Sequence, residues 1–158
     1  MKIAEFTINN DYVIDVFLFP EGSEIAVTRF EGLVSSNIYN NWSIKYVVEG
    51  NYMKFAPEVD YVHFSDRPLT RIDFGKNMHR MGVLSFIGSN TYQVSDRLMF
   101  IMNNETGKSY DGICAPIGVV AIDHQKKLEQ LKEGMKIEKI IIKDLPKEEI
   151  LARIPAFI

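Results

Sequence analysis

The chain has 158 residues, of which 46% are hydrophobic and 25% are charged, and its formal net charge is −3. These values are typical of globular proteins, and they exclude a mainly disordered, collagen-like or supercharged chain. A chain of this length is expected to form a single domain over residues 1–158, with enough buried surface for a core of its own.

Cys114 is the single cysteine, which excludes an intramolecular disulfide and a zinc site built from several thiolates. No base lies near it in the sequence, so we expect a buried, apolar cysteine. No apolar run approaches the roughly 20 residues that a spanning helix needs, and no signal peptide is indicated. We therefore expect a cytoplasmic protein without a membrane partner.

The first half of the chain reads as short strands rich in β-branched and aromatic residues. Glu49-Gly50-Asn51 between two of them predicts a hairpin, because glycine supplies the positive φ that tight turns need. The expected strands are Lys2–Ile8, Tyr12–Phe19, Glu24–Phe30, Trp42–Val48, Tyr52–Phe55, Tyr61–Phe64, Arg71–Phe74 and Met81–Ile87.

The helical signals are fewer and come later. Ser95-Asp96 predicts a helix start, with an apolar face formed by Leu98, Ile101 and Met102. His124–Glu133 is predicted to be a thinly apolar helix that Gly134 ends, and Lys136–Lys143 a strand. Pro146 begins a last short helix. This order predicts an α+β fold: a mainly antiparallel sheet with two or three short helices, mostly in the C-terminal half.

Charge and aromatic residues are unevenly distributed. Residues 1–75 contain six basic and eleven acidic residues, whereas residues 76–158 contain twelve and ten, so the net charges are −5 and +2. An acidic, aromatic-rich half disfavours nucleic acid and favours a basic protein partner. The alternative is that the aromatic side chains fill a core and the carboxylates coat its surface. The candidate partner-binding residues are Tyr39, Trp42, Glu49, Tyr52, Glu58, Asp60 and Tyr61.

Catalytic motifs are weak. His63, Ser65, Asp66 and Arg67 lie close in sequence and could surround an enzyme cleft, but triads are defined by geometry, and a cross-strand hydrogen bond is the simpler role for His63. His63-Phe64-Ser65 also resembles the histidine strand of folds that transfer ADP-ribose from NAD, for which Tyr92 and Glu105 are candidates. No metal-ligand spacing or phosphate-binding loop is present. We therefore expect no catalytic residues, no cofactor and no metal.

Two segments carry a family resemblance. Tyr92-Gln93-Val94-Ser95-Asp96-Arg97-Leu98 reads as a strand entering a Ser-acidic-Arg helix start. Residues 137–143 form a strand, after which Ile150-Leu151-Ala152-Arg153-Ile154-Pro155 places an arginine among hydrophobic residues. Together these segments resemble immunity proteins of bacterial polymorphic toxin systems.

The resemblance implies a non-enzymatic protein that neutralises a cognate bacterial toxin by direct contact. An acidic first half suits a basic toxin such as a nuclease. The partners expected are a toxin and, as a possibility, a second copy of the chain, with no nucleic acid. The alternatives are a small enzyme with a cleft around His63, either a hydrolase or an NAD-using transferase, and a structural or assembly subunit.

Overall fold

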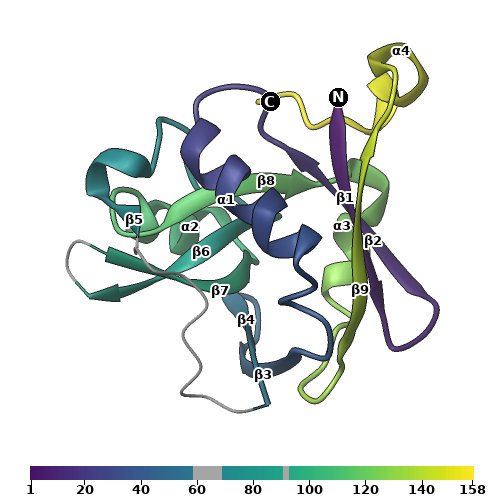
Figure 1. Ribbon diagram of the computed structural model, residues 1–158, viewed down its shortest axis with the longest axis horizontal. Coiled ribbons are helices and arrows are strands. Elements are labelled where there is room, and N and C mark those ends of the chain that lie inside the picture. The colour runs from purple at the N-terminus through teal and green to yellow at the C-terminus, as the bar shows by residue number, and fades with distance from the viewer. Residues whose placement is uncertain (59–68, 91–92) are drawn as a thin grey trace.

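The computed structural model describes residues 1–58, 69–90 and 93–158 (Figure 1). Within these residues nine strands form one antiparallel sheet in the order β3-β4-β7-β6-β8-β2-β1-β9, with the short β5 beside β7. The strands are β1 (Lys2–Ile8), β2 (Tyr12–Leu18), β3 (Ser43–Val48), β4 (Tyr52–Ala56), β5 (Leu69–Thr70), β6 (Val83–Asn90), β7 (Gln93–Ile101), β8 (Ala115–Val120) and β9 (Ile137–Asp144).

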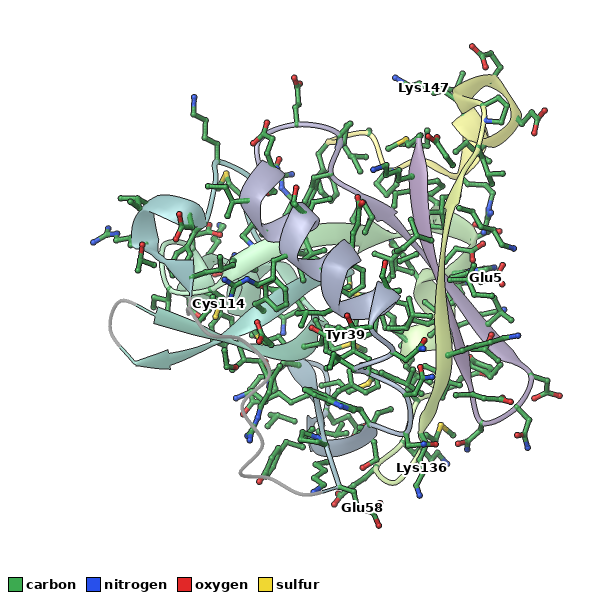
Figure 2. The ribbon with its side chains drawn as sticks, viewed as in Figure 1. Glu5, Tyr39, Glu58, Cys114, Lys136 and Lys147 are labelled. Atoms are coloured by element: carbon green, nitrogen blue, oxygen red, sulfur yellow. The ribbon has the colours of Figure 1, made fainter. Side chains whose placement is uncertain are left out.

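The sheet closes on itself into a barrel. Its two end strands meet where β3 and β9 begin, through an isolated antiparallel bridge between Ser43 and Lys136. The Ile44 N–H donates to Met135 O (2.9 Å), and the Gly134 N–H donates to Ile44 O (2.8 Å). Lys136 marks this seam at the lower end of Figure 2. Closure leaves each strand with an inner and an outer face, so side chains alternate between the barrel core and the outer side of the sheet.

An aromatic chain runs through the barrel core. Phe6 stacks on Phe30 and contacts Phe100, with ring centroids 6.3 and 5.8 Å apart. Phe30 also packs on Tyr39, whose ring meets Trp42 edge-on at 4.9 Å. Both Tyr39 and Trp42 are therefore interior residues, and Tyr39 lies in the middle of the fold in Figure 2.

The prediction that helices lie mostly in the C-terminal half is wrong. The longest described helix is α1 (Glu24–Ser35), in a region predicted to be a strand. Its buried residues recur at helical spacing, which packs one face of α1 onto the barrel core. These residues are Ala26, Val27, Phe30, Leu33 and Val34. The later helices are shorter: α2 (Asn104–Tyr110), α3 (Gln125–Leu128) and α4 (Lys147–Ile150), with 3-10 turns at Arg71–Asp73, Ile122–His124 and Leu151–Arg153.

The helix expected after Ser95 is also wrong, because this segment is strand β7. Leu98 and Phe100 point into the barrel core, while Met99 and Ile101 belong to a second apolar cluster on the outer face. A strand that is buried on both faces has contiguous apolar residues, and such a run imitates the face of a helix. The predicted α+β arrangement therefore gives way to a β-barrel with a few short helices.

Other predicted elements agree with the structure. β1, β2, β3, β4, β6, β9 and the last helix occur within a few residues of their expected positions. Residues 71–73 form a 3-10 turn where a strand was expected, and the strand predicted at Tyr61–Phe64 lies outside the described residues. No helix in the described part of the chain is both long and apolar enough to cross a membrane.

Candidate functional site

The outer face of the barrel carries a cluster of aromatic, apolar and basic side chains, which we call the Tyr52–Cys114 cluster: Tyr52, Lys54, Met99, Tyr110 and Cys114. The Tyr52 and Tyr110 rings meet edge-on with centroids 6.4 Å apart, and the Lys54 ammonium lies 4.7 Å from the Tyr52 centroid. Met99 and Cys114 are buried beneath this layer, and Tyr110 packs against them. The cluster thus has an apolar floor, an aromatic wall and one cation.

Local hydrogen bonds fix the two tyrosines relative to each other. Asn103 caps α2 by accepting from the Thr106 N–H (2.7 Å), and its amide group donates to Asn51 Oδ1 (3.0 Å). The Thr106 hydroxyl donates to the same Asn51 oxygen (2.8 Å). The turn that leads into Tyr52 is therefore tied to the start of the helix that ends at Tyr110.

Cys114 is held as a neutral thiol. The Gly88 N–H donates to its sulfur (3.3 Å). Burial raises the pKa of Cys114 to about 11, and the Gly88 hydrogen bond and the charge of Lys54 only partly oppose this rise. A thiol with this pKa is protonated at neutral pH and is no nucleophile. Burial also raises the pKa of Tyr110, and the neighbouring Tyr52 adds to the effect. The cluster therefore offers apolar contacts and neutral or cationic hydrogen-bond donors.

A buried network anchors the chain below the cluster. His79 Nδ1 lies 2.9 Å from Asp111 Oδ1, and Nε2 lies 2.8 Å from Ser85 Oγ. The His79 backbone N–H donates to the same Asp111 oxygen (2.8 Å). The network joins β6 to the segment between α2 and β8, and the His79 ring is 6.5 Å from that of Tyr110. It therefore positions the loop that carries Tyr110 and Cys114.

The order Ser85–His79–Asp111 matches that of a hydrolytic triad, but it lacks access. Ser85 is 0% and His79 is 1% exposed, so no substrate carbonyl can reach the hydroxyl. Burial lowers the pKa of His79, against the opposing hydrogen bond and charge of Asp111, so the imidazole is neutral at pH 7. We assign the Nδ1 proton to the Asp111 bond, which leaves Nε2 to accept from Ser85. The network is structural.

The structure separates the candidate partner-binding residues. Tyr39 and Trp42 are 1% and 2% exposed, because both fill the barrel core, so they offer no surface to a partner. Glu49 and Glu58 are exposed, and Tyr52 is half-buried in the Tyr52–Cys114 cluster. The remaining two candidates, Asp60 and Tyr61, lie outside the described residues.

The structure leaves the candidate enzyme residues untested, except for Glu105. His63, Ser65, Asp66, Arg67 and Tyr92 fall outside the described ranges. Glu105, the other residue considered for an NAD site, is exposed on α2, 3.5 Å from Lys108. Cys114 is buried, as expected.

Sequence reasoning did not select Lys54, Tyr110 or Met99. A weak signal was available for Lys54, because Tyr52 and Lys54 alternate with Met53 and Phe55 along one strand and so share the outer face. Tyr110 had no comparable signal. It reaches the cluster only because α2 folds back onto the β3–β4 turn.

Comparison with known proteins identifies the fold. No protein-family model and no curated protein matches the sequence. Among solved structures, a cyclophilin-type peptidyl-prolyl cis-trans isomerase of Cryptosporidium parvum matches with a TM-score of 0.63 and 13% identity, over 92% of this chain and 99% of that one. Its structure in the presence of the dipeptide Ala-Pro matches with a TM-score of 0.62 and 14% identity, over 90% and 99% of the two chains. The cyclophilin AquaCyp293 of Hirschia baltica matches with a TM-score of 0.67 and 12% identity, over 88% and 73%.

These matches overturn the resemblance to immunity proteins. The Ser95-Asp96-Arg97 segment that carried it is the middle of a barrel strand and starts no helix. The predicted toxin partner, and the prediction of a non-enzymatic protein, are likewise contradicted by neighbours that are isomerases. The hydrolase, transferase and assembly-subunit alternatives do not match these neighbours either. At these identities the likeness is one of architecture, and on that ground the chain has the cyclophilin fold.

Proposed function

We propose that this protein is a peptidyl-prolyl cis-trans isomerase that binds an X-Pro segment at the Tyr52–Cys114 cluster. The observation that carries the proposal is the combination, on a cyclophilin-fold barrel, of two half-buried tyrosine rings with a half-buried ammonium beside them. One neighbour was crystallised in the presence of Ala-Pro, which supports a proline-containing ligand.

The chemistry of the cluster suits rotation about an X-Pro bond. The barrier of about 18–20 kcal/mol arises from amide resonance, which is lost when the bond twists. Twisting removes charge from the carbonyl oxygen and leaves a lone pair on the proline nitrogen. The half-buried Tyr52 and Tyr110 rings, which cover the buried Met99 and Cys114, form an apolar surface that disfavours the polar planar form. A donor such as the Lys54 ammonium stabilises the nitrogen lone pair. The edge-on tyrosines provide a wall for the pyrrolidine ring.

The proposal is tested by NMR exchange spectroscopy on an Ala-Pro peptide, whose uncatalysed exchange takes tens of seconds or longer. We expect catalytic amounts of the protein to accelerate exchange and to shift the amide resonances of the cluster. Lys54→Met should reduce the acceleration about tenfold or more. Lys139→Met is the matched control, because Lys139 is exposed on β9. Exchange at the uncatalysed rate with the wild-type protein would refute the proposal.

A further inference from the structure

Among the residues that the structure describes, the barrel seam is closed at one end only. The start of β3 bonds to residues 134–137, but beyond Ile44 the only ladder partner of β3 among the described residues is β4. Tyr46, Val47 and Val48 follow there, 54%, 38% and 41% exposed. An apolar strand with one unpaired edge is a template for a further strand.

A groove of about 630 Å³ opens at this point, between the β3–β4 hairpin and the segment 128–133. Its apolar floor is formed by Val48, Met53, Met102, Leu128 and Leu131. This volume lies in the range of pockets that take a ligand of several side chains. Tyr52 lines the groove and also belongs to the Tyr52–Cys114 cluster, so the two surfaces share this residue.

The rim of the groove is acidic. Glu49, Glu129 and Glu133 line it together with one cation, Lys132. All four side chains belong to exposed residues, and none of the three glutamates forms an ion pair with another residue in the described ranges. The rim therefore has a surplus of negative charge around an apolar floor, which is complementary to an apolar side chain flanked by lysine or arginine.

We propose that this groove binds the part of the peptide substrate beside the prolyl residue, and that it selects an apolar side chain next to Lys or Arg. The proposal rests on the proposed isomerase function and names its substrate class. A peptide bound at Tyr52 continues into the groove, where its apolar side chain covers the floor and its cation meets the rim. The edge of β3 that has no ladder partner among the described residues offers backbone hydrogen bonds to the extended segment.

The test uses three synthetic peptides that share one Ala-Pro pair and a nearby leucine, followed by Lys-Lys, Gln-Gln or Glu-Glu. Dissociation constants are measured by calorimetry at low and at high salt. The Lys-Lys peptide should bind the wild-type protein about tenfold more tightly than the Glu-Glu peptide at low salt, and the difference should shrink at 0.5 M salt because the rim is exposed.

The triple variant Glu49→Gln, Glu129→Gln, Glu133→Gln should lose this preference and retain its affinity for the Gln-Gln peptide. The control variant Glu148→Gln, Glu149→Gln neutralises exposed carboxylates on α4, outside the groove, and should keep the preference. Equal binding of the three peptides, together with accelerated exchange, would overturn the groove proposal alone. Failure of every peptide to bind or to exchange would overturn the isomerase function as well.

Discussion

Replacing Ser85 by alanine tests whether the buried network holds the site in place. The serine hydroxyl lies 2.8 Å from His79 Nε2, and both residues are almost completely excluded from solvent. The variant leaves a buried imidazole nitrogen without its partner, which costs about 1–3 kcal/mol. For a chain of this size a loss of about 2 kcal/mol lowers the Tm by roughly 4–8 °C.

The measurement is urea unfolding followed by circular dichroism, with Ser35→Ala as the matched control. Ser35 is exposed at the end of α1, where its hydroxyl donates to Glu31 O (2.9 Å), so its removal should change the free energy of unfolding by less than about 0.5 kcal/mol. If Ser85→Ala were as stable as Ser35→Ala, the hydrogen bond to His79 would contribute nothing, and the anchoring role assigned to the network would be wrong.

Three further outcomes are expected. Gly118→Ala should lower the free energy of unfolding by about 2 kcal/mol or more, because the added Cβ would lie 2.3 Å from Phe17 O in the neighbouring strand. Gly32→Ala, which has open space around it on α1, should raise the free energy of unfolding by about 0.5–1 kcal/mol. Chemical denaturation of both variants checks these values. Because burial lowers the pKa of His79, the unfolded chain binds a proton more readily than the folded one. The free energy of unfolding should therefore be highest above about pH 7 and fall as the pH drops below about 6.5. Denaturation between pH 5 and 8 measures this, and a flat profile would contradict it. Cys114, with a thiol pKa of about 11, should react with iodoacetamide far more slowly at pH 7 in the folded protein than in urea, as mass spectrometry can follow.

The sequence predicts β1, β3 and β9 because β-branched, aromatic and other strand-forming residues are concentrated in them. The burial along these strands does not follow a strict period of two, since β1 is buried on both faces over most of its length. The burial of Cys114 follows from its apolar neighbours. The prediction fails for segments that are buried by residues from distant parts of the chain.

Two segments illustrate that failure. Between Glu24 and Phe30 the β-branched residues suggested a strand, but Ala26, Val27 and Phe30 continue to Leu33 and Val34 at helical spacing, a signal that appears only in a longer window. Around Ser95 the apolar outer residues of β7 are covered by residues from β6, β8 and Phe19, which no local pattern discloses. The candidate site depends on the same non-local packing, since Tyr110 meets Tyr52 across 58 positions of sequence.

The pairing of β1 with β9 has a kinetic consequence. Lys2 lies opposite Asp144, so one edge of the first strand finds its partner only after nearly the whole chain has been made. At about 5–20 residues per second, translation leaves that edge open for roughly 7 to 30 s. Loops of this length close slowly and expose the nascent chain to aggregation. Until β9 is made, this edge of β1 is a bare strand edge that can pair with another chain.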